Sequence, residues 1–158
     1  MKATRNTPDQ LILENNPIWL VVFINAFALI FIAVGLFMLP DALLIGIAFT
    51  LGGLLIAVAF NLAFARRTQL ILDRPANRIE LRRRSLLAYY RQIWTIADVT
   101  GATVQTSMSG DSPTHRAALN VHIYGRDEVH PVTLVYTSGS GPAQAVTLIN
   151  DWLNQTRP

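Results

Sequence analysis

The sequence has no cysteine among its 158 residues. This absence excludes disulfides, zinc–thiolate sites, iron–sulfur clusters and thiol nucleophiles. Charge is also scarce, because charged residues make up 15% of the chain where a soluble domain has roughly 25%. Between Pro17 and Ala65 the only ionisable side chain is Asp41. The chain therefore divides into a nearly charge-free N-terminal third and a polar remainder.

Two apolar runs, residues 17–39 and 42–65, fill the charge-poor part and are separated only by Pro40 and Asp41. Each exceeds the roughly 20 residues with which a helix crosses the hydrocarbon of a bilayer. Since Pro40 interrupts the first helix and Asp41 can cap the second, the sequence predicts a transmembrane hairpin over residues 17–65. Two helices of a soluble core, or a cleaved signal peptide, fit these lengths less well.

Positive charge flanks the predicted hairpin on one side only. Lys2 and Arg5 precede the first run, Arg66 and Arg67 follow the second, and the turn between the runs has no positive charge. The positive-inside rule therefore predicts that both termini are cytoplasmic. Residues 1–16 form a cytoplasmic N-terminal segment, which could lie in the membrane interface or pack on the cytoplasmic domain.

Small and amide side chains within the two runs are candidates for helix packing. Small residues four apart let helix backbones approach closely. They could pack the hairpin itself, or they could form a docking face for another membrane protein. The two asparagines are expected to bond each other, a backbone carbonyl or a partner helix. The candidate packing residues are Asn25, Ala48, Gly52, Gly53, Ala57 and Asn61, with Ala59 and Ala63 at the same spacing.

Residues 66–158 show the two-residue alternation of strands followed by one helical pattern. We expect a turn at residues 74–77, a loop at 108–115, a turn at 125–128, and a final helix after Gly141 whose Asn150 faces water. The final helix carries an apolar stripe that would close one end of a bent antiparallel sheet. Together these features predict an α+β membrane protein, in which a β-barrel or sandwich of six or seven strands is capped by a C-terminal helix. The expected strands are 68–73, 78–84, 86–96, 101–107, 117–124 and 129–137.

The order of these elements resembles that of membrane-anchored bacterial pleckstrin-homology-like (PH-like) proteins. The matching features are two N-terminal spans, the stretch "RPANRIELRRRSLL", the link "IADV" at residues 96–99 and the closing "AVTLINDWLN" helix. The layout is more weakly similar to that of the photosystem I assembly factor with two spans, through the same link and through Pro131 and Leu134. The resemblance implies a bacterial inner membrane, either the plasma membrane or an intracytoplasmic one, and a cytoplasmic PH-like domain over residues 66–158. No photosynthetic function is carried over.

The stretch from Ala65 to Arg91 contains eight arginines, no lysine and two acidic residues. Arg66 and Arg67 are expected to anchor the hairpin at lipid phosphates. The other cations could bind anionic headgroups or a protein partner, or they could be a solvated strand face with local pairs such as Glu80. The candidate lipid- or partner-binding residues are Arg66, Arg67, Arg74, Arg78, Arg82, Arg83, Arg84, Tyr90 and Arg91.

Nothing in the sequence has the pattern of a catalytic or metal site. His115, His122 and His130 lack the spacing of a helical metal site, and we expect no metal and no cofactor. Asp111, Ser112 and His115 include triad residue types, but they fall in one predicted loop. The "GSG" at residues 139–141 lacks the lysine of a phosphate loop, so we interpret it as a helix entry.

These observations favour a non-enzymatic protein. We expect an integral membrane scaffold, assembly factor or accessory subunit that binds a membrane protein complex through its hairpin and its PH-like domain. The alternative is a module that binds anionic lipid headgroups with the arginine-rich strand face. The expected partners are membrane lipids and another integral membrane protein, and neither nucleic acid nor a small-molecule substrate is expected.

Overall fold

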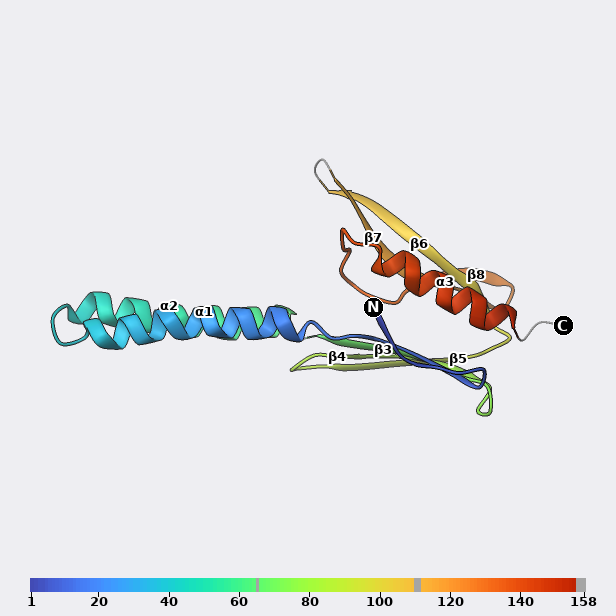
Figure 1. Cartoon of the computed structure of the whole chain (residues 1–158), viewed down its shortest axis with the longest axis horizontal. Helices are drawn as coiled ribbons and strands as arrows, with labels where there is room; N and C mark the ends of the chain where they lie inside the picture. The colour runs from blue at the N-terminus through green and yellow to red at the C-terminus, as the bar shows by residue number, and fades with distance from the viewer. Residues whose placement is uncertain (65, 110–111, 156–158) are drawn as a thin grey trace. The chain divides into compact units, whose positions relative to one another are not determined.

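The computed structural model describes residues 1–64, 66–109 and 112–155 of an α+β chain (Figure 1). The chain forms two compact units. The first holds residues 1–15, 68–83 and the chain from Tyr89 onward, and the second holds Asn16–Arg67 and Arg84–Ala88. The elements in chain order are β1 (Lys2–Asn6), β2 (Gln10–Asn15), α1 (Ile18–Met38), α2 (Leu43–Phe64), β3 (Arg67–Asp73), β4 (Arg78–Arg84), β5 (Tyr89–Thr95), β6 (Val99–Ser109), β7 (Ser112–Ile123), β8 (Arg126–Pro131) and α3 (Gly141–Asn154).

The second unit, called the helical unit below, consists mainly of α1 and α2, which lie side by side along their lengths (Figure 1). The helices have 21 and 22 residues. By length and composition both are long and apolar enough to cross a membrane. Their bounds agree with the predicted runs to within one or two residues, and Ala65 lies outside the described residues. In the turn, the Met38 carbonyl accepts hydrogen bonds from the N–H groups of Asp41 and Ala42.

The two helices pack through residues without bulky side chains. Ala28 and Gly35 of α1 are buried, and Gly46 and Gly53 of α2 face them. A Cβ atom on Gly35 would lie 2.8 Å from the Gly46 carbonyl oxygen, and one on Gly53 would lie 2.9 Å from that of Ala28. Such distances leave no room for a side chain, so glycine at these positions is what permits the close approach of the backbones.

The first unit, called the β unit below, contains two antiparallel sheets of described strands. One has five strands in the order β1-β2-β3-β4-β5, and the other has three in the order β6-β7-β8. Strand β2 pairs with β3 from Gln10↔Asp73 to Asn15↔Thr68. Residues 2–15 are therefore two strands of the larger sheet, and of the two alternatives for this segment the structure supports packing on the domain.

The core of the β unit lies between the two sheets and α3. Helix α3 packs on β6 and β7, with fewer contacts to β1 and β2. The apolar stripe predicted for the helix is buried at Ala145, Ile149, Trp152 and Leu153. The sheets contribute alternate residues, as a two-residue period requires. The sheet members of this core are Leu11, Leu13, Leu70, Leu72, Ile79, Leu81, Trp94, Val99, Ala102, Ala117, Leu119 and Val121, and Val132, just after β8, belongs to the same core.

Three predicted elements of the β unit differ from the structure. The expected loop at 108–115 is mostly strand, because β6 runs to Ser109 and β7 begins at Ser112, and residues 110–111 lie outside the described residues. The expected 125–128 turn is shorter, since β8 already begins at Arg126. The expected strand 129–137 ends at Pro131. Beyond it the Val132 N–H donates to the Ala117 carbonyl at 2.8 Å, and an isolated bridge joins Thr137 to His115. Leu134 and Val135, between them, are exposed.

The orientation expected for Asn150 is also wrong. Its side-chain oxygen accepts from the Ala102 N–H at 2.8 Å, and its amide nitrogen donates to the Ala102 carbonyl at 3.0 Å. The side chain thus satisfies a backbone pair of β6 rather than facing water. Six strands follow residue 66 among those described, which agrees with the predicted number. The PH-like fold itself stays a prediction.

Candidate functional site

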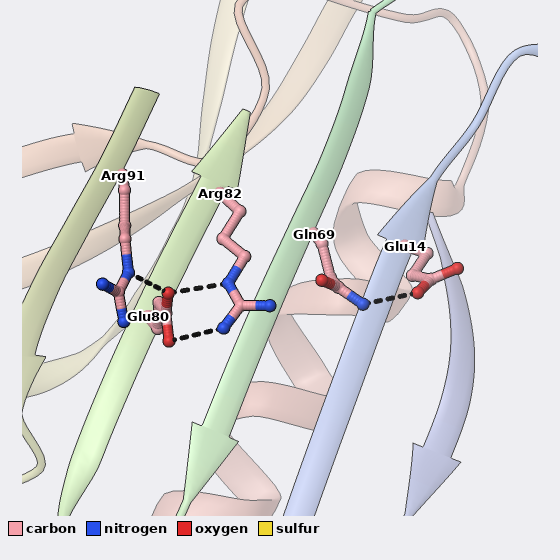
Figure 2. A network of polar contacts seen from close by, with 5 residues as sticks. All are labelled: Glu14, Gln69, Glu80, Arg82 and Arg91. Atoms are coloured by element: carbon pink, nitrogen blue, oxygen red, sulfur yellow. Dashed lines mark hydrogen bonds and ion pairs between the residues drawn. The ribbon is translucent and has the colours of Figure 1, made fainter. Parts of the chain in front are cut away.

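A buried carboxylate organises part of the arginine-rich region. Glu80 lies on the face of β4 opposite to the core residues Ile79 and Leu81, yet its exposed fraction is 0%. Arg82 donates from Nε to Oε1 at 2.6 Å and from Nη2 to Oε2 at 3.0 Å. Arg91 of β5 donates to the same Oε1 (Figure 2). The two guanidinium groups therefore cover the carboxylate and replace the water it would otherwise bind.

The electrostatics of this cluster follow from its hydrogen bonds. The bonds from Arg82, and then from Arg91, lower the pKa of Glu80 to about 2, although burial acts in the opposite direction. The Glu80 carboxylate in turn raises the pKa of Arg82 and of Arg91. All three groups are charged at neutral pH, so the cluster carries one net positive charge instead of two.

The same face of the sheet continues as a row of side-chain pairs (Figure 2). Gln69 of β3 donates to Glu14 of β2 at 2.6 Å, and these residues are also partners in the strand register. Gln10 of β2 donates to Asp73 of β3 at 3.0 Å, near the other end of the same strand pair. The polar face is therefore largely satisfied by contacts within the sheet, as in the solvated-face interpretation.

Two further candidate arginines make contacts inside the β unit. Arg74 donates to the Trp152 carbonyl at 2.7 Å, and its guanidinium lies 4.4 Å from the centre of the Trp152 ring. Arg83 donates to the carbonyls of Pro131 and Val132, and it lies 5.4 Å from the centre of the Tyr90 ring. Burial lowers the pKa of Arg83. These side chains connect β4 and its turn to α3 and to the end of β8.

The candidates that are left differ in their surroundings. Arg78 is half-buried, and its Nε has no hydrogen-bond partner within the described part of the chain. Arg66, Arg67 and Arg84 are exposed and belong to the helical unit. Among the described residues, these three have no ion pair and no side-chain hydrogen bond. The structure thus separates three free cations from the arginines that hold the β unit together.

The turn between β4 and β5 carries two leucines at its tip. The N–H of Ser85 donates to the Ala88 carbonyl at 2.9 Å, and the Ala88 N–H donates to the Ser85 Oγ at 3.0 Å. Leu86 and Leu87 stand between them and are 63% and 83% exposed. Since Ser85 and Ala88 satisfy the backbone of the turn, the leucines have no role in closing it. Sequence reasoning placed both leucines in the expected strand 86–96, whereas β5 begins at Tyr89, and so missed this tip.

In the helical unit the two predicted asparagines face each other. Asn61 donates to the Asn25 side-chain oxygen at 2.9 Å, and Asn25 donates to Asn61 at 3.3 Å. Each amide also donates to the carbonyl four residues earlier, Val21 for Asn25 and Ala57 for Asn61, at 2.7 Å. Of the three expected kinds of partner, the structure shows the opposite asparagine and the backbone carbonyl.

The small residues predicted for helix packing fall on two faces of α2. Gly53 is buried against α1, and Ala57 is half-buried. A Cβ atom on Gly52, in contrast, would have no atom within 4 Å, and Ala48 is exposed. The prediction missed Gly35, Gly46 and Ala28. The spacing of seven residues between Ala28 and Gly35, and between Gly46 and Gly53, is the sequence signal that identifies the packed face.

The histidines make separate local contacts. His115 lies 3.0 Å from the Thr106 hydroxyl, His122 lies 2.6 Å from Asp127, and His130 lies 3.0 Å from Glu128. Within residues 1–64, 66–109 and 112–155, no three His, Asp or Glu side chains are grouped so that they could hold a metal ion. Of the three residues with triad types, Asp111 lies outside the described residues, whereas Ser112 and His115 lie in β7.

The sequence matches no protein-family model, and a search of the curated proteins finds no match.

Proposed function

We propose that the chain is a non-enzymatic integral membrane protein that acts as a scaffold, assembly factor or accessory subunit of another membrane complex. Helices α1 and α2 cross a bacterial inner membrane, with both termini on the cytoplasmic side. The β unit, a PH-like domain, contacts the cytoplasmic surface of the same complex. The length and apolar composition of the two helices support the membrane placement, and the outer face of α2 carries the proposal of a partner.

That outer face is a row of small side chains. With about 100° of rotation per residue, Ala48, Gly52, Ala59 and Ala63 lie within about 60° of one another around α2. The three alanines are exposed, and Gly52 has open space around it. Gly46 and Gly53, which pack the hairpin, lie about 110–130° away from the centre of this row. The hairpin therefore closes without the outer row.

A row of small side chains that faces lipid gains no packing energy from its shape, because fluid lipid tails adapt to side chains of any size. Toward another helix it allows a close backbone approach, which is a main source of helix association in hydrocarbon. The asparagines bond each other inside the hairpin, so the partner need not satisfy them. The row is thus suited to an apolar helix of an integral membrane protein.

Adjacent glycines provide a matched test. In the full chain, extracted in mild detergent, Gly52→Leu should abolish co-purification of the partner complex and leave the hairpin intact. Gly53→Leu should instead destabilise the hairpin, because its side chain would meet the backbone and side chains of α1. The measurements are native-size analysis with mass spectrometry of the bound proteins, and thermal unfolding. The proposal would be refuted if the unsubstituted chain purified as a monomer without bound proteins, or if the Gly52→Leu chain retained its partner.

The second candidate function is recognition of anionic lipid headgroups. The observation that favours it is a group of three exposed cations, Arg66, Arg67 and Arg84, for which the described part of the chain supplies no side-chain partner. Each cation near an anionic surface contributes about 1 kcal/mol. Arg82 and Arg91 contribute less, because Glu80 neutralises one of their charges.

This candidate is tested by replacing the three free arginines with alanine in the full chain. In vesicles that mix phosphatidylcholine and phosphatidylglycerol, the triple variant should lose the enrichment of phosphatidylglycerol around the protein, as measured with spin-labelled lipids. Arg126→Ala, at an exposed position on β8, is the control and should not change it. Equal enrichment in all three proteins would exclude headgroup recognition by these side chains.

A further inference from the structure

The exposed leucines of the β4–β5 turn stand out against the leucines of the strands. Leu70, Leu81 and Leu119 are buried to 1% exposure or less, whereas Leu86 and Leu87 are 63% and 83% exposed. Glycine, asparagine and aspartate are favoured in two-residue turns where the central residues need a positive φ, and neither Leu86 nor Leu87 has one. The backbone of this turn therefore accepts many residue types, and nothing in it selects two adjacent exposed leucines.

Strand direction places this tip at one of the two edges of the five-stranded sheet that are formed by the ends of its strands. Strand β2 ends at Asn15 and β3 begins beside it, since Asn15 pairs with Thr68. Both helices are connected to this edge, because α1 follows β2 and β3 follows α2 in the chain. Strand β4 follows β3 through a short turn and runs back, so β4 ends at the same edge. The turn residues Arg84–Ala88 accordingly group with the helices in one compact unit.

The charges around the tip complete the pattern. Arg84 adjoins Leu86 in the turn, and Arg66 and Arg67 adjoin α2, all three of them exposed. Exposed leucines flanked by arginines are suited to a membrane interface, where apolar side chains enter the acyl boundary and cations stay at the phosphates. A protein partner would explain the leucines, but it would not explain cations on both chain segments at this edge.

We propose that the Leu86–Leu87 tip inserts into the interfacial layer of the bilayer, with Arg84, Arg66 and Arg67 at the lipid phosphates. This inference rests on the proposed function in that it requires α1 and α2 to span that bilayer. The tip is a third membrane contact of the chain, in addition to α1 and α2. The partner of this surface is lipid, and neither a second copy of the chain nor another protein is needed.

Because the chain has no cysteine, single reporter sites can be introduced without removing others. Ala88→Cys, at an exposed turn position, carries an environment-sensitive fluorophore in the full chain, reconstituted into phosphatidylcholine vesicles. Phosphatidylcholine brominated near the headgroup end of its acyl chains should quench most of this fluorescence. In the Leu86→Ser/Leu87→Ser background the quenching should be lost and the emission should shift to that of a label in water.

Two further label sites make the outcomes distinguishable. A label at Leu55→Cys, an exposed position of α2, should be quenched by a second lipid that is brominated deep in its acyl chains. A label at Tyr124→Cys, in the exposed turn between β7 and β8, should be quenched neither by this lipid nor by the one brominated near the headgroup. A label at residue 55 that behaves as in water overturns the membrane-spanning hairpin and, with it, the proposed function.

If residue 55 is quenched and residue 88 is not, only the inserted tip is overturned. A label at residue 88 with blue-shifted emission but without quenching by brominated lipid identifies protein packing at the tip, which also overturns the proposal. Thermal unfolding of the serine variant, unchanged from that of the parent chain, shows that the loss of quenching does not come from misfolding.

Discussion

The two units of this chain distribute polar and apolar side chains in opposite ways. In the helical unit, Phe37 and Leu44 are each 83% exposed, while the amides of Asn25 and Asn61 bond each other between the helices. In the β unit, Leu11 and Leu72 are fully buried, and charged pairs occupy the outer face of the sheet. The helical unit thus has apolar side chains outside and its polar pair inside, whereas the β unit has apolar side chains inside and charged pairs outside.

This inversion is what the proposed membrane-spanning hairpin requires, since the two units would then pack in different solvents. In water, burial of apolar surface drives the packing of the β unit at about 25 cal/mol per Å². Between helices in hydrocarbon that force is absent, and close contact and hydrogen bonds take its place. The glycines at Gly35, Gly46 and Gly53 supply the first, and the asparagine pair supplies the second. The predictions below test this contrast by exchanging the surroundings or the charges of the two units.

The largest expected effect comes from separating the units. Since Asn15 pairs with Thr68, an Asn-Gly turn can replace Asn16–Arg67 and join β2 directly to β3. With Leu86→Ser and Leu87→Ser at the exposed tip, we expect this joined β unit to be soluble and to unfold cooperatively in urea. Its circular dichroism should show strands and one helix.

The control is the simple fragment that begins at Thr68. It lacks β1 and β2, and with them Leu11 and Leu13 of the core. Loss of two buried leucines removes about 3–6 kcal/mol, which is comparable to the whole stability of a small domain at about 5–15 kcal/mol. We therefore expect this fragment not to fold. A fragment as stable as the joined unit would show that the N-terminal strands are dispensable.

A charge on the outer surface distinguishes the solvents of the two units. Leu29 of α1 and Val135 of the β unit are exposed to similar degrees, 63% and 60%. In a bilayer, Leu29→Arg near the middle of the helix should disfavour insertion by about 3 kcal/mol, whereas Val135→Arg should change stability by less than about 0.5 kcal/mol. Carbonate extraction of membranes measures insertion. Equal retention of both variants would contradict a lipid-facing α1.

The two units also differ in how well sequence predicts them. The helices and their turn depend on composition and on contacts close in sequence, so residues 17–39 and 42–65 identify them nearly to the residue. Strands β1 and β2 carry only a short alternation, and their partner β3 follows after the whole hairpin. Their place in the sheet depends on pairing over a long sequence separation, which local patterns do not reveal.

The candidate site shows the same limit. Sequence named Glu80 as a local partner for the arginines, and the pair with Arg82, two residues away, follows from strand alternation. The bond from Arg91 depends on how β4 and β5 align, and the contact of Arg74 with Trp152 depends on where α3 packs. Sequence therefore located the cations but could not separate those that hold the fold from Arg66, Arg67 and Arg84.

The smallest effect tests the Glu80 cluster of the β unit by pH. Because the pKa of Glu80 in the folded state is about 2, below its ordinary value of 4.5, the cluster stabilises the fold fully above pH 4.5. That contribution is lost as the pH falls from 4.5 through 2. With Arg82 and Arg91 partly exposed to screening solvent, we expect it to be about 1–2 kcal/mol.

Glu80→Gln in the joined β unit should accordingly lower the free energy of unfolding by that amount at pH 7, and the difference from the parent should shrink below pH 4.5 and be mostly lost near pH 2. Urea unfolding over this pH range measures it. Asp151→Asn, at an exposed position on α3, is the control and should leave the pH dependence unchanged. A difference that persists at pH 2 would mean that the side chain acts through its packing, and that the charges of the arginine-rich face are not coupled to the stability of the sheet.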